Sequence, residues 1–266
     1  MKILFFGDVF GKAGRQALLT ALPGLKLEFK PDFIIANAEN LADGKGVTEK
    51  TLHPIFSSGV DAVTGGNHLW DRAESLDYIR KEHRIVKPMN YPSGIPGNPY
   101  LVLQKEQHKL GVICLCGQTY MPSCDSPFSS LERFLETRTD IFPLLMDFHA
   151  ESTSEKRAMG WFADGKINIV IGTHTHIQTA DEEILPLGCA YITDAGMTGA
   201  HDSVIGVKKN IIVDKFTTGI PNRYEAADLG LQVNALFIEL DDENGIAIEI
   251  TRIKRDVVIT DTLSLR

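Results

Sequence analysis

The chain of 266 residues has few cysteines, no long apolar run and no excess of basic residues. Four cysteines in a chain of this size do not form a disulfide framework, so we expect a reducing compartment, the cytoplasm. No stretch approaches the roughly 18 apolar residues of a membrane-spanning helix, and no membrane association is expected. The apolar run at residues 2–6 is too short for a signal sequence and precedes an acidic residue, which favours a β-strand.

Acidic residues outnumber basic residues by 35 to 27, which gives a net charge of −8 and a sequence pI near 5.5. Extended nucleic-acid binding needs a basic face that displaces counterions, so the composition argues against it and against a nuclease for long RNA. The hydrophobic content of 43% and the mean hydropathy of −0.05 are those of an ordinary folded protein. The length allows one large α/β domain or two small ones.

Apolar runs alternate with helical patterns in the first half of the chain, which predicts a parallel or mixed sheet. Strands are expected near residues 2–6, 32–36, 60–64 and 85–86, with helices near 15–22, from 48 to 58 and near 72–81. Pro23 is expected to end the first helix.

The second half is richer in strands. We expect hairpins at 100–104 with 110–116 and at 231–240 with 246–253, strands at 144–148, 167–171 and 190–193, and helices near 129–135 and 154–163. Because no linker or repeat interrupts this order, we interpret residues 1–266 as a single domain. In this domain, two sheets pack face to face and the helices lie outside them.

Side chains with oxygen or nitrogen donors follow successive apolar runs. They are Asp8, Glu39, Asn40, Asn67, His149, His174 and His176. Open α/β sheets place their sites at the carboxyl ends of strands, so these side chains are expected to meet. Asp8 or Asn67 alone would more often be a turn residue, but recurrence at five strand ends favours a metal centre. This mixture of carboxylate, amide and imidazole suits Fe or Mn, with Zn as an alternative, better than Ca or Mg, which prefer oxygen ligands alone.

The ordered motifs resemble those of the calcineurin-like metallophosphoesterases. The segments that carry the resemblance are Asp8, Glu39-Asn40, Gly66-Asn67-His68, His149 and Gly172–His176. The resemblance implies a four-layer α/β/β/α sandwich of two mixed sheets flanked by helices, with a dinuclear metal centre. The chain departs from the general pattern where Phe10 replaces a histidine and Glu39 replaces the bridging aspartate.

These departures resemble one branch, the YmdB-like bacterial phosphodiesterases, along nearly the whole chain. The matching segments are residues 37–40, 65–71, 147–151 and 193–199. The branch implies hydrolysis of a small-molecule cyclic nucleotide, either 2′,3′-cyclic or 3′,5′-cyclic or both. It also implies that Asp8, Glu39, Asn40 and His176 hold one metal ion, that Glu39, Asn67, His149 and His174 hold the other, and that Glu39 bridges both.

His68 is interpreted as the general acid of this reaction. Two metal ions that share a water lower its pKa, so a bridging hydroxide is expected to attack phosphorus while the ribose alkoxide requires a proton. Asp71 either orients the His68 ring or caps the next helix. His201 and Thr198, in a glycine-rich loop, are weak candidates for contact with substrate, and Trp70 could stack on a base or pack internally.

Two other functions are compatible with the residues. A phosphomonoesterase, either a nucleotidase or a protein phosphatase, would use the same metal ligands, but the absence of arginine beside Asn40 and Asn67 favours a monoanionic diester. A non-catalytic metalloprotein that regulates through protein contacts is the second alternative, although it would not need His68. The sequence leaves open the metal, the base preference and the oligomeric state, and it is compatible with a homo-oligomer.

Overall fold

The computed structural model describes residues 1–140 and 142–259, so residues 260–266 of the predicted domain lie outside the described part. In the described residues, two sheets form the centre of the molecule. The first has the order β2-β12-β13-β1-β3-β4-β5, with β14 paired to β13, and the second has the order β10-β11-β9-β8-β7-β6.

The strands of the first sheet are β1 (Lys2–Phe6), β2 (Asp8–Val9), β3 (Phe33–Asn37), β4 (Ala62–Thr64), β5 (Ile85–Val86), β12 (Met197–Ala200), β13 (Leu231–Leu240) and β14 (Ala247–Asp256). Those of the second are β6 (Tyr100–Lys105), β7 (His108–Cys116), β8 (Leu144–His149), β9 (Ile169–Thr173), β10 (Glu183–Ile184) and β11 (Ala190–Ile192). Both sheets mix parallel and antiparallel pairs, as expected.

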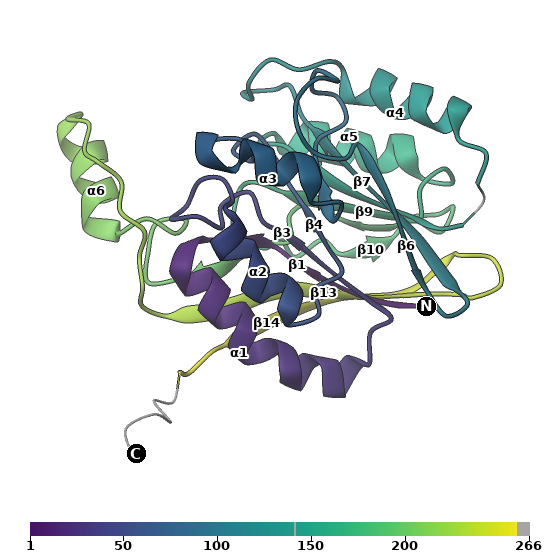
Figure 1. Cartoon of the computed structure of the whole chain (residues 1–266), viewed down its shortest axis with the longest axis horizontal. Coiled ribbons are helices and arrows are strands. Elements are labelled where there is room, and N and C mark those ends of the chain that lie inside the picture. Colours follow the sequence, from purple (N-terminus) through teal and green to yellow (C-terminus); the bar gives the residue numbers. More distant parts are fainter. Residues whose placement is uncertain (141, 260–266) are drawn as a thin grey trace.

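All of the helices except α6 cover the outer faces of the sheets (Figure 1). The helices are α1 (Gly11–Phe29), α2 (Glu49–Ser57), α3 (Leu76–Lys81), α4 (Pro127–Thr137), α5 (Thr153–Ala163) and α6 (Lys209–Thr218). One apolar cluster packs the helices α1, α2 and α3 against the first sheet, and another packs α4 and α5 against the second. A third cluster lies between the two sheets. The predicted four-layer α/β/β/α sandwich is confirmed. No helix in the described ranges has both the length and the apolar character needed to span a membrane.

The prediction that Pro23 ends the first helix is wrong, because α1 continues to Phe29 with Pro23 inside it. Leu22 and Leu25, on either side of the proline, are buried against the first sheet, whereas Pro23 itself is exposed. Burial of this apolar face offsets the lost backbone hydrogen bond, which costs about 3 kcal/mol in a helix interior.

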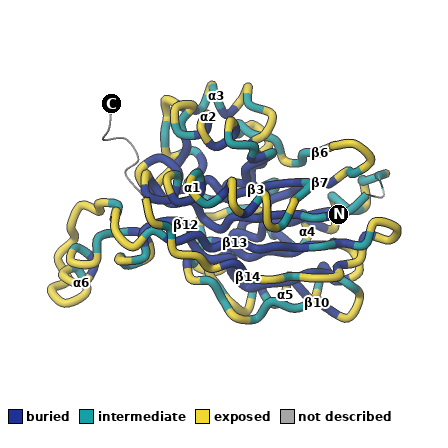
Figure 2. The backbone as a smooth tube through the Cα atoms, turned by 90° about the horizontal axis from the view of Figure 1, so that it is seen from below, coloured by how far each residue is buried: buried dark blue, intermediate teal, exposed yellow. Residues whose placement is uncertain are grey.

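The helix expected near residues 72–81 divides into a short 3-10 turn at Ala73–Ser75 followed by α3. The sequence patterns did not predict α6, which projects from the body together with the loop that follows it (Figures 1 and 2). Ile212 is the buried residue of this helix, so α6 lacks the wide apolar stripe by which core helices are predicted.

Parallel pairing brings the predicted donors to one edge of the sandwich. β1 and β3 run parallel, as do β3 and β4 in the first sheet and β7, β8 and β9 in the second. In each sheet, the carboxyl ends of these strands therefore lie at one edge. The contact between Glu39, after β3, and His149, at the end of β8, brings the two edges together, and Asp8 follows β1 there. The candidate site forms there.

Candidate active site

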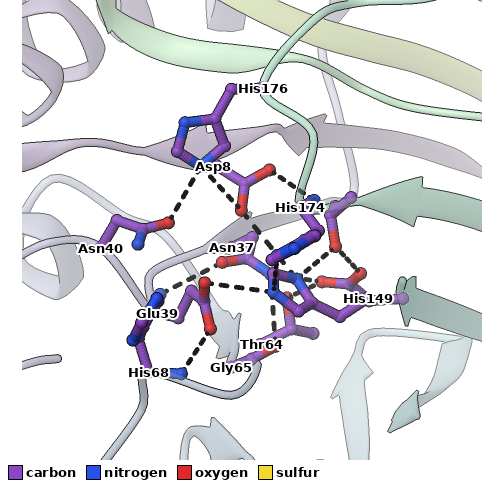
Figure 3. A network of polar contacts seen from close by, with 12 residues as sticks. Asp8, Asn37, Glu39, Asn40, Thr64, Gly65, His68, His149, His174 and His176 are labelled. Carbon is purple, nitrogen blue, oxygen red and sulfur yellow. Dashed lines mark hydrogen bonds and ion pairs between the residues drawn. The ribbon is translucent and has the colours of Figure 1, made fainter. Parts of the chain in front are cut away.

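The imidazoles of three histidines, His149, His174 and His176, converge at the carboxyl edge of the two sheets (Figure 3). Each ring is also fixed by a polar contact of its outer nitrogen. His149 ends β8 and is fully buried. Thr173 Oγ1 donates to Asp147 Oδ1 at 2.6 Å, so the same hydroxyl accepts from His149 Nδ1 at 2.9 Å. The remaining nitrogen, Nε2, is therefore directed into the site.

His149 Nε2 faces other donor atoms at close range. They are Glu39 Oε1 at 3.1 Å, Asn67 Oδ1 at 3.2 Å and His174 Nδ1 at 3.0 Å. Glu39, His149 and His174 form a group whose ligand atoms all lie within 4.8 Å of one another. Lone pairs that meet at such distances repel one another unless a proton or a metal cation lies between them, so this group fits a metal ion.

His176 forms a second such corner. Its Nδ1 donates to the carbonyl of Ile205 at 2.9 Å, which directs the Nε2 lone pair inward. Asn40 Oδ1 lies 3.3 Å from this Nε2, because the Asn40 amide nitrogen donates away from the site to Gly44 O at 3.0 Å. Phe10, which has no donor atom, packs edge-on against the His176 ring, with the centroids 5.5 Å apart.

Asp8 provides the clearest sign that this corner fits a cation. Its Oδ2 accepts from the His174 backbone N–H at 3.2 Å, but its fully buried Oδ1 has no hydrogen-bond partner among the described residues. That oxygen lies 3.9 Å from His176 Nε2 and 4.0 Å from His149 Nδ1. A buried carboxylate oxygen without a partner is costly, and a metal ion would compensate it.

His174 is oriented by a residue that the sequence patterns gave no role. Glu151 Oε2 lies 3.1 Å from His174 Nε2, so this nitrogen donates outward and Nδ1 faces His149. Burial and repulsion by His149 lower the pKa of His174 to about 3, which keeps the ring neutral. A neutral imidazole is the form that binds metals.

Glu39 and His149 shift one another's pKa values in opposite directions. Burial opposes ionisation of Glu39, but attraction to His149 outweighs it and lowers the pKa of Glu39 to about 2. Burial also disfavours a charged His149, but attraction to Glu39 and Asp8 raises its pKa to about 9. At neutral pH, Glu39 and His149 therefore form an ion pair, and a metal ion would displace the proton on His149.

The backbone that carries His174 and His176 is strained, and hydrogen bonds from Thr175 to Asp194 hold it in place. Both residues have positive φ, 100° and 66° respectively. Between them, the N–H and the hydroxyl of Thr175 donate to Asp194 Oδ2 at 3.1 and 2.7 Å. The buried Lys156 ammonium donates to the same oxygen at 2.6 Å. This network holds the turn in a conformation that L-residues rarely adopt.

Gly66 allows Glu39 and His149 to approach one another. A Cβ atom at this position would lie 2.5 Å from His149 Nε2 and would also collide with the Glu39 carboxylate. Glu39 Oε2 accepts from the backbone N–H of His68 at 2.8 Å, which anchors the carboxylate beside this turn.

His68 lies beside the donor cluster and is oriented by Asp71. Its Nδ1 lies 2.8 Å from Asp71 Oδ2, and its ring lines the cavity described below. Asp71 does not cap a helix, because Arg72 precedes the 3-10 turn and makes no side-chain capping bond. Of the two roles considered for Asp71, the structure therefore supports orientation of His68.

A cavity of about 440 Å³, here called the active-site cavity, opens onto this cluster. Its size falls within the range of about 300–1,000 Å³ that is typical of small-molecule sites. The donor side is formed by Glu39, Asn40, His68, His174 and His176. Other lining residues come from the segments on either side of α6 and include Ile205, Val207, Tyr224 and Ala226.

The weaker candidates are placed outside this cavity. Thr198 is fully buried in β12 and donates to Asn234 O at 2.9 Å. His201 Nε2 donates to Met197 O at 2.9 Å, and neither residue is part of the cavity lining. Trp70 packs on Tyr91, with the ring centroids 5.0 Å apart, which agrees with internal packing. Contact of Thr198 or His201 with substrate stays a prediction.

Supporting residues around the centre were missed from the sequence. They are Asp147, Thr173, Glu151, Lys156 and Asp194. Asp147 had a local signal, since it lies two residues before His149 and therefore on the same face of the strand. Lys156 had none, because a lysine on an amphipathic helix is expected to face solvent.

Comparisons with known proteins agree with this architecture. The sequence model of the YmdB-like protein family matches residues 4–253. A Bacillus subtilis protein named 2′,3′-cyclic-nucleotide 2′-phosphodiesterase is 44% identical over 95% of this chain and 96% of its own length.

Two solved structures share the whole fold. One is described as a novel phosphatase from Mycoplasma pneumoniae, with 34% identity and a TM-score of 0.92 over 96% of this chain and 93% of that chain. The other is a hypothetical protein from Thermus thermophilus, with 35% identity and a TM-score of 0.90 over 96% of this chain and 99% of that chain. The expected class, an enzyme that hydrolyses phosphoric ester bonds, is confirmed. The family match and these relatives show that the chain belongs to the YmdB-like family.

Proposed function

We propose that this chain is a metal-dependent phosphodiesterase of cyclic nucleotides, with 2′,3′-cyclic nucleotides as its main substrates. The observation that carries the proposal is the set of three imidazoles whose inner nitrogens face Glu39, Asn40, Asn67 and the unpartnered oxygen of Asp8. The name of the Bacillus subtilis relative supports the 2′,3′-cyclic class, and 3′,5′-cyclic nucleotides are a second class to test.

The donor groups divide into two sets, and we infer a dinuclear centre of Fe or Mn, with Zn as an alternative. Asp8, Asn40 and His176 would hold one ion; Asn67, His149 and His174 would hold the other; and Glu39 would bridge them. Such ions supply Lewis acidity and a nucleophilic water at neutral pH. Glu151, Thr173 and the Ile205 carbonyl orient the three histidines toward that role.

His68 is proposed to protonate the leaving ribose oxygen. Asp71 accepts from His68 Nδ1 and orients the ring, which leaves Nε2 to deliver a proton. Because His68 lines the active-site cavity and its backbone N–H binds Glu39, it lies beside the donor cluster without belonging to it.

The cavity lining favours a diester over a phosphomonoester. The described residues that line it include Lys45 but no arginine. Arg72 donates instead to the carbonyls of Ala42 at 2.7 Å and Lys45 at 3.1 Å. A dianionic monoester would require more positive charge than a monoanionic cyclic diester. Family membership with named phosphodiesterases also favours an enzyme over the non-catalytic metalloprotein.

A substrate panel tests this function directly. Protein reconstituted with Mn²⁺ or Fe²⁺ is assayed with 2′,3′-cyclic AMP, 3′,5′-cyclic AMP, adenosine 3′-monophosphate and an RNA oligomer. We expect the 2′,3′-cyclic diester to give the highest kcat/KM, and chelator-treated protein to be inactive. A preference for the monoester or for RNA would contradict the proposal, as would full activity at one metal ion per chain by elemental analysis.

Asn40→Ala is expected to lower the metal content selectively. Asn40 provides the amide oxygen beside His176, whereas the group around His149 does not include it. Elemental analysis of the dialysed protein should fall from about two ions per chain to about one, because only one of the two proposed ion sites loses a ligand. Asn210→Ala, on the exposed surface of α6, is the matched control and should retain both ions. Retention of both ions by Asn40→Ala would show that Asn40 is not a ligand.

A further inference from the structure

The active-site cavity has an apolar wall that the proposed chemistry at the metal centre does not use. Ile205, Val207, Tyr224 and Ala226 contribute to it, and the residues Ile205 and Tyr224 are 48% and 46% exposed. Apolar and aromatic surface beside a few polar groups in one cavity is typical of a small-molecule binding site. Resting on the proposed function, we infer that this wall is the nucleobase subsite and that Tyr224 stacks on the base.

The wall has a fixed geometry, because its two segments pair with each other at the base of α6. Val207 and Ala226 form an antiparallel bridge. On either side of that bridge, Lys208 N donates to Glu225 O at 2.9 Å, and Ala227 N donates to Gly206 O at 2.8 Å. These bonds hold the wall in one geometry before any ligand binds, which reduces the entropic cost of binding.

The wall is also tied to the metal centre. Ile205, whose side chain lines the cavity, accepts from His176 Nδ1 through its carbonyl at 2.9 Å. A phosphate bound beside His176 would therefore place the rest of a nucleotide along Ile205 toward Tyr224. This juxtaposition of a phosphate-binding end and a flat apolar end within one cavity matches the two parts of a nucleotide.

Tyr224 is anchored from the side of α6. Its hydroxyl pairs with Lys215 Nζ, which also lies 5.0 Å from the centroid of the Tyr224 ring. A second cavity of about 620 Å³ shares Tyr224, Glu225 and Ala226 with the first, so the tyrosine stands at the boundary between the two. An aromatic ring held at such a boundary suits stacking, which every base allows because each has a π-face.

The test compares substrates with and without a base. The ratio of kcat/KM for 2′,3′-cyclic AMP to that for glycerol 1,2-cyclic phosphate reports the contribution of the base, because both contain the same five-membered cyclic diester. Tyr224→Ala is expected to lower this ratio about 5- to 150-fold, which corresponds to about 1–3 kcal/mol of stacking. Tyr224→Phe should retain the ratio, and Tyr120→Ala, at a tyrosine that is 90% exposed and outside the cavity, serves as the matched control.

Equilibrium dialysis with labelled adenosine separates this inference from the proposed function. Adenosine is expected to bind the wild type and Tyr224→Phe, and to bind Tyr224→Ala at least about fivefold more weakly. Adenosine binding that depends on Tyr224 without hydrolysis of either cyclic diester would overturn the phosphodiesterase function but support the subsite. The subsite would be overturned if Tyr224→Ala left the ratio of kcat/KM unchanged or bound adenosine as tightly as the wild type. It would also be overturned if this variant lost equal activity on both diesters and changed its oligomeric state on size-exclusion chromatography.

Discussion

His68→Ala should lower kcat for 2′,3′-cyclic AMP by about 10²–10⁴-fold, the usual contribution of a positioned general acid. A ribose alkoxide has a conjugate-acid pKa far above neutrality, so it leaves slowly without a proton. A nitrophenolate leaves readily without one, and the loss on bis-nitrophenyl phosphate should therefore be much smaller. The measurement is steady-state kinetics on both substrates, with the metal content of each preparation determined in parallel.

Two control variants distinguish a loss of proton transfer in His68→Ala from a loss of structure. Asp71→Asn removes the charge that accepts from His68 Nδ1 and should reduce the rate on the cyclic nucleotide less than His68→Ala. His53→Ala, at an exposed histidine of α2, should change neither rate. Equal losses on both substrates in His68→Ala would instead assign the residue a structural role, and no loss on either would remove it from the site.

Lys156→Met should lower the free energy of unfolding of the metal-free protein by about 3–5 kcal/mol. Lys156 and Asp194 are 1% and 0% exposed in their side chains and lie 2.6 Å apart. Removing the ammonium leaves the Asp194 carboxylate buried without its counter-charge. This carboxylate also accepts the hydrogen bonds of Thr175, so the turn that it holds is destabilised as well. Urea titration in the presence of chelator measures the change without the additional stability that bound metal provides.

Lys209→Met provides the matched control for Lys156→Met. Lys209 also forms an ion pair, with Asp202, but the two side chains are 62% and 45% exposed. Exposed pairs contribute about 0–1 kcal/mol, so this variant should unfold almost as the wild type does. A comparably small effect of Lys156→Met would show that the buried pair does not stabilise the turn between His174 and His176.

Much of the donor set was predictable because metal ligands at strand ends leave a local signal. Asp8, Glu39, Asn67 and His149 each interrupt or follow an apolar run, and polar groups there need a partner or a ligand. The resemblance to metallophosphoesterases then ordered them into two groups, and the structure brings the members of each group together. That they bind two metal ions stays a prediction.

The outer partners of the histidines were not predictable from local patterns. Glu151 follows His149 by two residues, yet its carboxylate contacts His174, which comes directly after the next strand, β9. Ile205 reaches His176 through a backbone carbonyl, a group that every residue carries and that no side-chain pattern can single out. Lys156 lies on a helix whose pattern predicts solvent exposure, and only the packing of α5 on the second sheet buries it.

The sequence by itself determined the alternation of strands and helices, the two face-to-face sheets and the identity of the metal-compatible donors, because these depend on hydrophobic periodicity and on residue chemistry near strand ends. Only the tertiary structure decided which nitrogen of each histidine faces the centre, that α1 continues through Pro23, and that Tyr224 forms a wall of the active-site cavity. These features depend on contacts between residues far apart in the chain, which local periodicity does not encode.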